Sequence, residues 1–155
     1  MNEYMNKAIE LSRENLDKKF GGPFGAIIVK NGKIVGKGIN RVIKDNDPSA
    51  HAEIVAIRDA CKNLNTLDLT GCILYTSCYP CPMCLSATIW SNIKSVYYAN
   101  TKEDAASIGF RDDLIYNYIL NGSKDDNILE LESMCREEAI KVFEEYNSNK
   151  DKIIY

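Results

Sequence analysis

Three cysteines lie within seven residues in the stretch Cys78-Tyr79-Pro80-Cys81-Pro82-Met83-Cys84, and no other segment constrains the chain as strongly. Two prolines hold the backbone between the sulfurs. Thiols at such close spacing are typical of two kinds of site, one that holds zinc and one that holds an iron–sulfur cluster. Residues elsewhere in the chain must decide between them.

The composition is that of a globular protein with free or metal-bound thiols. The 155 residues are sufficient for one domain, 1–155, with a sizeable core. Apolar residues make up 45% and charged residues 26%, and the net charge of -3 includes no basic excess that would favour nucleic acid or an anionic membrane. No apolar run approaches the roughly 20 residues of a membrane-spanning helix. Six cysteines and no export signal in the charged segment 1–14 predict a reducing, cytoplasmic location.

The order of hydrophobic patterns predicts an α/β fold. Apolar residues at helical spacing indicate a first helix over about residues 4–16, and Gly21-Gly22-Pro23 then breaks the pattern. Asn31-Gly32 between two apolar runs is a strong hairpin signal. We expect strands at 24–30, 33–39, 72–76, 95–99 and 128–131, and helices at 50–64, 82–91, 105–108, 111–120 and 136–146. Ser49 is the expected cap of the helix at 50–64. Strands that alternate with helices imply a sheet covered on both faces.

A histidine and a glutamate supply the other half of the candidate site. Cys81 and Cys84 share one face of a first helical turn, where the helix dipole favours thiolates. His51, the single histidine, stands at the start of an earlier expected helix, and Glu53 follows two residues later. His-x-Glu combined with Pro-Cys-x-x-Cys is the signature of zinc deaminases. Three protein ligands leave the fourth zinc position open for water, as in catalytic sites.

Each part of this signature has an ordinary alternative when it stands alone. A single Cys-x-x-Cys is often structural or redox-active, and Glu53 at a helix start is often only a favourable charge. The three cysteines also match the start of a bacterial ferredoxin run, but the adjacent fourth cysteine of that run is missing. Cys61, Cys72 or Cys135 would have to supply it from a distance. The iron–sulfur alternative leaves His51 and Glu53 unexplained, so the order and spacing of all the parts favour zinc.

Segments beyond the zinc motifs are shared with a known family. They are Gly21-Gly22-Pro23-Phe24-Gly25-Ala26, Asn46-Asp47-Pro48, Leu74-Tyr75-Thr76-Ser77-Cys78, Ala105-Ala106, Gly109-Phe110-Arg111-Asp112-Asp113 and a final Tyr155. On these residues the chain resembles the cytidine and deoxycytidylate deaminase superfamily over nearly its full length, and most closely its bacterial guanine deaminases. The resemblance implies a three-layer α/β/α sandwich on a mixed five-stranded sheet. It also implies a homodimer that exchanges its C-terminal segment, so that Asp112 and Tyr155 complete a partner's pocket.

The zinc motif and the resemblance together predict a hydrolytic deamination. One zinc ion per subunit, held by His51, Cys81 and Cys84, lowers the pKa of water from about 16 toward 7, and the hydroxide attacks C2 of guanine. Glu53 is the predicted catalytic residue, because it takes the proton from water, delivers it to the ring nitrogen and then protonates the departing amine in a second transfer. The products are xanthine and ammonia, which is a reaction of purine catabolism.

The predicted substrate is a small nucleobase with five candidate contacts. Asn40 donates to and accepts from a base edge, and Phe24 stacks on the purine. Ala52 offers its backbone N–H to a ring carbonyl, Asp112 accepts from ring N–H groups, and Tyr155 closes the pocket against water. Four of them have an ordinary alternative without the resemblance: Asn40 is a turn residue, Phe24 a core residue, Asp112 a solvated residue at a helix start and Tyr155 a disordered terminus.

One position departs from the family pattern, and other substrates stay open. Many relatives carry Glu where this chain has Tyr79, so a role of that carboxylate beside the zinc ligands is in doubt here. The alternatives are adenosine in transfer RNA, cytosine, a deoxynucleotide, or a binding module without catalysis, which the intact Glu53 disfavours. Residues 124–155 hold five Lys/Arg against nine Asp/Glu, which argues against RNA. No arginine cluster for a phosphate is visible. Neither nucleic acid nor a membrane is an expected partner.

Overall fold

The structure, a computed structural model, describes residues 2–155, which form two compact units. The first unit ends at Tyr116 and contains the sheet, and the second spans Asn117–Tyr155. None of the helices within residues 2–155 combines the length and the apolar content that a membrane span requires. A single domain over 1–155 stays a prediction.

A four-stranded mixed sheet forms the centre of the first unit. β1 pairs antiparallel with β2 and with β3, whereas β3 and β4 are parallel and are connected through a helix. Asn31 and Gly32 both have positive φ, as a tight hairpin between β1 and β2 requires. The strands, in the sheet order β2-β1-β3-β4, are β1 (Gly25–Lys30), β2 (Lys33–Ile39), β3 (Cys72–Cys78) and β4 (Ser95–Asn100).

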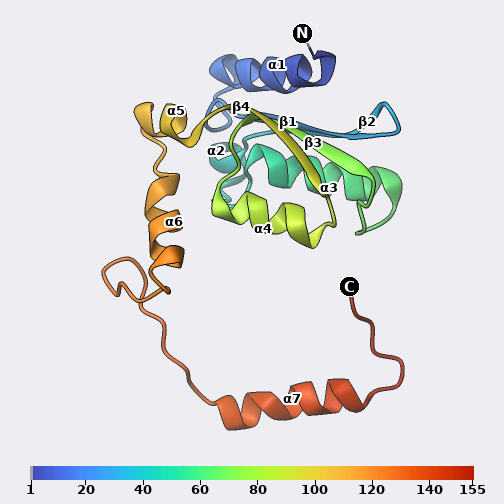
Figure 1. Cartoon of the computed structure of the whole chain (residues 1–155), viewed down its shortest axis with the longest axis vertical. Coiled ribbons are helices and arrows are strands. Elements are labelled where there is room, and N and C mark those ends of the chain that lie inside the picture. The colour runs from blue at the N-terminus through green and yellow to red at the C-terminus, as the bar shows by residue number, and fades with distance from the viewer. Residues whose placement is uncertain (1) are drawn as a thin grey trace. The chain divides into compact units, whose positions relative to one another are not determined.

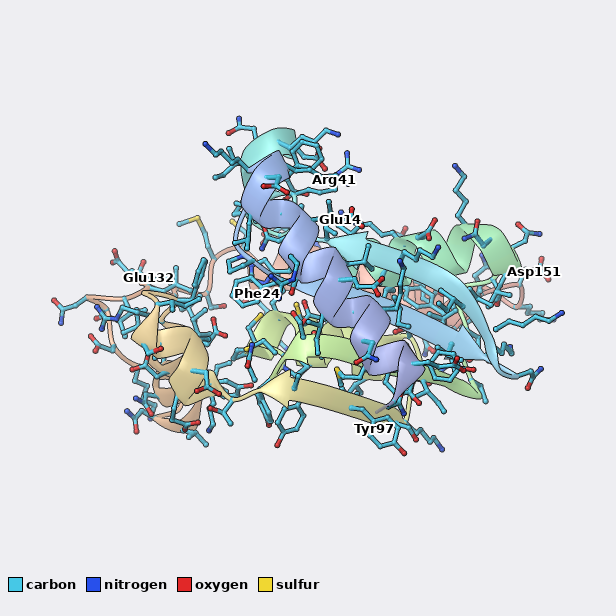
Figure 2. The ribbon with its side chains drawn as sticks, turned by 90° about the horizontal axis from the view of Figure 1, so that it is seen from above. Glu14, Phe24, Arg41, Tyr97, Glu132 and Asp151 are labelled. Atoms are coloured by element: carbon cyan, nitrogen blue, oxygen red, sulfur yellow. The ribbon has the colours of Figure 1, made fainter. Side chains whose placement is uncertain are left out.

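Helices cover both faces of this sheet, as the sequence predicts. Figure 1 shows α1 (Glu3–Lys18) on one face, with α3 (Ala52–Leu64) and α4 (Pro82–Trp90) on the other. Figure 2 shows α1 from above, lying across the strands, with Tyr97 on the outer strand β4. The three-layer α/β/α arrangement is confirmed.

Strand β1 is buried on both sides, which explains its continuous run of apolar residues. Ile27 and Val29 face the α1 layer, and Ala26 and Ile28 face the α3 layer. All four side chains are at most 3% exposed. Because side chains alternate across a strand, a strand between two helical layers must be apolar at successive positions.

The buried side of α1 differs from the apolar pattern that predicted the helix. Ala8 and Leu11 are buried, and the next buried position of the same stripe is the polar Asn15. Ile9 and Leu16, which belong to the apolar pattern, are 38% and 59% exposed. The inner face of α1 therefore ends in a buried carboxamide.

Helix α3 begins two residues later than predicted, and Ser49 is not its cap. The Ser49 hydroxyl and the Ser49 N–H both donate to Asp47 Oδ1, at 2.7 and 2.8 Å, so the hydroxyl serves a turn and not the helix. The cap position is His51, whose backbone is extended and whose side chain makes no capping hydrogen bond. The imidazole is thereby available to the site.

Two glycines of β2 let α3 approach the sheet closely. A Cβ at Gly36 would lie 2.8 Å from Ala60 Cβ, and a Cβ at Gly38 would lie 2.6 Å from Ala56 N. Neither separation is tolerated by close-packed atoms. The missing side chains on β2 and the alanines on α3 therefore set how deeply α3 packs, and with it the position of the helix start that carries His51.

The expected fifth strand at 128–131 is wrong within this chain. These residues form a turn followed by irregular backbone, and Asp125 O accepts the N–H groups of Ile128 and Leu129. A strand needs a neighbouring strand to complete its hydrogen bonds. Within residues 2–155 the sheet has four strands, and β4 forms one of its edges.

The remaining helices are short or belong to the second unit. The stretch between β2 and α3 contains one helical turn, which the ion pair between Arg41 and Asp45 bridges. α7 has no buried residue. These helices are α2 (Val42–Asp45), α5 (Lys102–Ser107), α6 (Asp112–Leu120) and α7 (Arg136–Ser148).

Candidate active site

Two helix starts bring three ligand atoms to one point. His51 is the N-cap of α3 and Cys81 is the N-cap of α4, while Cys84 lies in the first turn of α4. His51 Nδ1 lies 3.5 Å from Cys81 Sγ and 3.6 Å from Cys84 Sγ. Both cysteines are buried and the histidine is partly buried. The three residues that the sequence predicts as ligands are thus assembled from two separate elements.

The spacing of these atoms fits zinc. A tetrahedral zinc lies about 2.3 Å from sulfur and about 2.0 Å from nitrogen, which separates the two ligand atoms by about 3.5 Å. The two nitrogen–sulfur distances agree with this value. The hydrogen bond between the two thiols lowers the pKa of Cys81 and raises that of Cys84. Such a pair holds one proton, which a divalent cation displaces when it binds both thiolates.

Cys78 is not part of this group. Its Sγ lies 3.4 Å from the carbonyl oxygen of Thr101. Among the described residues, one group of at least three histidine, cysteine or carboxylate ligand atoms lies entirely within 4.8 Å, and it consists of His51, Cys81 and Cys84. Burial raises the pKa of the Cys78 thiol to about 11, so the thiol stays protonated at neutral pH. The iron–sulfur alternative, which needs a third thiolate from this stretch, has no support in the geometry.

Glu53 lies beside the ligand atoms and is removed from water. The residue is 6% exposed, and Thr76 Oγ1 donates to its Oε1 at 3.0 Å. The other oxygen, Oε2, lies 3.5 Å from Cys84 Sγ. Burial raises the pKa of this carboxyl, which suits a group that exchanges protons near neutral pH. Sequence reasoning missed Thr76, although a threonine in a buried, largely apolar strand was an available signal.

A cavity of about 280 Å³ opens in front of these groups. This volume lies near the lower end of the range for small-molecule sites, so it suits a free base better than a nucleotide. All of its walls belong to the first unit. The lining residues are Gly21, Gly22, Phe24, Asn40, Val42, Ile43, Pro48, His51, Glu53, Cys78, Tyr79, Cys81, Phe110 and Asp112.

Three of the five expected substrate contacts lie on the walls of this cavity. Phe24 packs edge-to-face with Phe110, with ring centroids 4.8 Å apart. Asn40 is 4% exposed, and its Oδ1 accepts the N–H of Val42 at 3.2 Å. Within residues 2–155 no hydrogen bond from Asn40 Nδ2 is found, so the amide hydrogens are available to a ligand. Burial raises the pKa of Asp112, and the neighbouring Cys81 charge adds to the effect.

The other two expected contacts, Ala52 and Tyr155, do not line the cavity. Ala52 is fully buried as the first residue of α3, between two residues that line the cavity. Tyr155 belongs to the second unit and is 81% exposed. The resemblance also implies that Asp112 completes a partner's pocket, whereas Asp112 lines the cavity of its own chain.

Tyr79, the departure from the family pattern, lies in an aromatic cluster at the cavity. Its ring centroid is 6.4 Å from that of Tyr116, and Lys102 Nζ lies 5.8 Å from its ring centroid. The Tyr116 hydroxyl donates to the Pro80 carbonyl at 2.8 Å. Tyr79 therefore occupies this position by packing rather than by charge. Tyr116 ties α6, which begins with Asp112, to the turn before the first cysteine ligand.

Comparison with known proteins decides the family. Residues 1–100 match the model of the cytidine and deoxycytidylate deaminase zinc-binding region. The chain belongs to this deaminase family. The matched residues include both halves of the zinc motif, so the zinc cofactor that the sequence predicts for this deaminase is confirmed.

Individual relatives narrow the resemblance within the deaminase family. A guanine deaminase of Bacillus subtilis (strain 168) is 52% identical over 116 residues, which are 75% of this chain and 74% of that protein. A tRNA-specific adenosine deaminase of Aquifex aeolicus (strain VF5) is 43% identical over 97 residues, 63% of this chain and 64% of that protein.

Solved structures also resemble this chain over most of its length. The X-ray structure of the guanine deaminase from Bacillus subtilis has a TM-score of 0.92 at 42% identity, and the match covers 100% of this chain and 99% of that one. The structure of the guanine deaminase from Nitrosomonas europaea has a TM-score of 0.67 at 37% identity, and the match covers 70% of this chain and 63% of that one.

Proposed function

We propose that this deaminase hydrolyses guanine to xanthine and ammonia with one zinc ion per subunit. The observation that carries the proposal is the convergence of His51, Cys81 and Cys84, with the buried Glu53 beside them, on one cavity of the size of a free base. The similarity to a guanine deaminase over three quarters of the chain supports guanine as the base.

The chemistry requires a metal, a base and an acid. When bound, zinc acts as a Lewis acid that brings the pKa of a water near neutrality. Glu53 Oε2 lies on the ligand side, so this carboxylate would accept the first proton of the water and pass it to the ring nitrogen. It would then pass the second proton, from the new hydroxyl at C2, to the amine, which leaves as ammonia. Thr76 holds Oε1, which keeps the carboxylate in one orientation through both transfers.

The cavity walls supply contacts that suit guanine. Asn40 donates from Nδ2 to an acceptor on the base edge, because its Oδ1 already serves Val42. Asp112 accepts from N–H groups, which guanine presents at N1 and at the exocyclic amine, whereas N1 of adenine is an acceptor. Phe24 and Phe110 provide an aromatic wall for the purine.

Two further contacts of the proposed complex rest on the family resemblance. Ala52 presents its backbone N–H in the first turn of α3, where helical N–H groups have no partner within the helix, to a ring carbonyl. Tyr155 closes the pocket against water. Both are proposals about the ligand-bound enzyme.

We also propose that the working enzyme is a homodimer that exchanges its second unit. The apolar side chains of α7 support this, because Val142, Phe143 and Tyr146 are 62%, 73% and 49% exposed. An isolated helix of 13 residues is only marginally stable in water, so an apolar stripe needs a surface to cover it. The open edge at β4 offers a second copy a place to pair.

We also propose a cytoplasmic location. All six cysteines are free, which is consistent with it.

An ammonia-release assay tests the substrate. The purified protein is incubated with guanine, adenine, cytosine and a transfer-RNA anticodon stem, and zinc is measured in the same sample. We expect ammonia from guanine and one zinc per chain. Ammonia from the anticodon stem and none from guanine would replace this proposal by transfer-RNA editing, and full zinc without turnover of any substrate would indicate a binding module.

A further inference from the structure

Asn15 is a buried polar side chain that the proposed mechanism does not use. It lies in the last turn of α1, in line with the buried Ala8 and Leu11, and it is 3% exposed. An asparagine in an apolar stripe costs stability unless its polar atoms are all bonded. Its contacts therefore show what this position provides.

The carboxamide of Asn15 makes three hydrogen bonds, each to the backbone of a different residue. Nδ2 donates to the carbonyl of Gly22 at 2.7 Å and to the carbonyl of Asn40 at 2.8 Å. Oδ1 accepts the N–H of Phe20 at 3.2 Å. Both amide hydrogens are used, and two carbonyl acceptors together with one N–H donor leave a single possible orientation for the amide.

The three backbone groups lie at one wall of the cavity: Gly22 and Asn40 line it, and Phe20 directly precedes the lining residue Gly21. The loop that follows α1 meets the end of β2 at this point, and the Asn40 N–H bonds to the Phe24 carbonyl at 3.1 Å. A Cβ at Gly21 would lie 2.9 Å from Asn40 Cγ, so the loop packs directly on the Asn40 side chain. The lining residues of this wall are Gly21, Gly22, Phe24, Asn40, Val42 and Ile43.

Helix α2 is bonded to Phe20, one of the residues that Asn15 contacts. The Phe20 carbonyl accepts the N–H groups of Ile43 and Lys44, at 2.9 and 3.0 Å. The Phe20 N–H is one of the groups that Asn15 holds. Two segments far apart in the sequence, the loop after α1 and the residues from Asn40 to Lys44, are therefore joined by backbone hydrogen bonds and by the side chain of Asn15, which bonds to both.

We propose that Asn15 is a positioning residue for the substrate, which sets the wall that carries Phe24 and Asn40. The inference rests on the proposed function for the identity of the base, but its structural part does not depend on it. Asn15 touches neither the zinc ligands nor Glu53 in any hydrogen bond of the described chain. Loss of its amide should therefore weaken ground-state and transition-state binding equally, and leave the chemical step intact.

Two substitutions separate positioning from packing. Asn15→Asp keeps the acceptor for the Phe20 N–H but removes both donors, and Asn15→Leu fills the volume and completes the apolar stripe. With each variant we expect KM for guanine to rise about tenfold or more, with kcat within about threefold of wild type and zinc content unchanged. If Asn15 serves packing alone, Asn15→Leu should match the wild type in KM.

Asn63→Asp is the matched control. Asn63 of α3 donates from Nδ2 to the carbonyl of Val35 in β2 at 2.9 Å. The same chemical change there removes one donor to a backbone carbonyl, away from the cavity lining. We expect its KM to equal that of the wild type. A rise in KM for this control equal to the rise for Asn15→Asp would overturn the assignment.

Amide hydrogen exchange, measured for each residue by NMR, tests whether Asn15 stabilises this wall of the cavity. The experiment needs no substrate. The N–H groups of Ile43 and Lys44 should exchange faster in both Asn15 variants, whereas the N–H of Phe20 should lose protection only in Asn15→Leu. Unchanged exchange in both variants would refute the proposal. If the wild type releases no ammonia from guanine, the proposed function fails, and the exchange pattern alone decides the role of Asn15.

Discussion

At the scale of single residues, the site depends on how its environment changes ordinary side chains. Glu53 would be a solvated charge at a helix start, but here β3 places a hydroxyl against one carboxylate oxygen and excludes water. Burial raises the pKa of the carboxyl and so moves it toward the pH at which proton transfer in both directions is efficient. The same residue type at the start of α7 is exposed and has no such role.

Replacement of Glu53 by glutamine tests the proton shuttle. The side-chain amide of the Glu53→Gln variant still accepts from Thr76 but cannot take up a proton, so kcat should fall roughly a hundredfold to ten-thousandfold while zinc stays bound. Stopped assays of ammonia release measure the fall in kcat. Mass spectrometry of the metal measures whether zinc stays bound. Robust turnover in a zinc-loaded Glu53→Gln protein would remove this residue from the mechanism.

Serine substitutions at the three neighbouring cysteines test which of them bind zinc. We expect Cys81→Ser and Cys84→Ser to lose zinc, because a serine hydroxyl does not ionise to replace a thiolate ligand. Cys78→Ser should retain one zinc per chain, since the Cys78 thiol contacts a backbone carbonyl and its pKa of about 11 keeps it protonated. Zinc loss in Cys78→Ser without loss of folding would contradict the assignment.

At the scale of elements, the site depends on the depth at which helices pack on the sheet. His51 and Cys81 begin two different helices, so their distance is set by α3 and α4 and not by the local chain. At the closest approach of the two elements, α3 presents alanines and β2 presents glycines. Small residues on both sides leave no freedom to adjust by rotating a side chain.

Gly38→Ala tests this packing depth. The new methyl group would meet the backbone of α3 at Ala56 N and at Ala52 O, so the helix must shift. We expect a loss of about 1–3 kcal/mol in the free energy of unfolding, a decrease of roughly 3–10 °C in Tm, and weaker zinc binding. Thermal unfolding with and without a chelator measures both effects.

Gly71→Ala is the comparison for that substitution. Gly71 also lacks a side chain, but a Cβ there would meet nothing within 4 Å. An alanine at this position would therefore lower the free energy of unfolding only through the positive φ. It should lower Tm with no change in zinc affinity. Equal zinc affinity in Gly38→Ala and Gly71→Ala would show that packing depth does not control the metal site.

At the scale of the whole molecule, the second unit has too little buried surface to explain its own stability. α7 has no buried residue, and its apolar side chains face water in the single chain. A second copy of the chain is the partner that we propose. The exchange would cover the apolar stripe of α7 and would bring Tyr155 to a pocket.

Complementation between two inactive chains tests the exchange. One chain carries Glu53→Gln with an intact tail, and the other keeps Glu53 but lacks Ile153–Tyr155. If the tail completes a partner's pocket, the mixed dimer contains one complete site, and random pairing should restore about a quarter of the wild-type turnover. A mixture no more active than its parts would place the tail on its own chain. Full activity of the truncated chain alone would remove Tyr155 from the mechanism.

The elements and the metal site could be predicted because their signals are local. Asn31-Gly32 makes a hairpin through its own backbone preferences, and Pro82 begins α4 because its fixed φ suits a first turn. The zinc ligands depend on residue type and on spacing within a turn. Fixed chemistry at a fixed spacing needs no knowledge of distant contacts.

Only the tertiary structure decided which partners these residues meet. Asn15 and Thr76 lie in segments that read as ordinary helix and strand, and their roles come from hydrogen bonds across 25 and 23 positions of the sequence. The fifth strand failed for the same reason, because an edge strand exists only if another edge is beside it. The sequence by itself determined the zinc chemistry and the three layers, since both follow from residue type and periodicity. The tertiary fold alone determined the orientation of the carboxylate and the support of the substrate wall, since those depend on how separate elements pack.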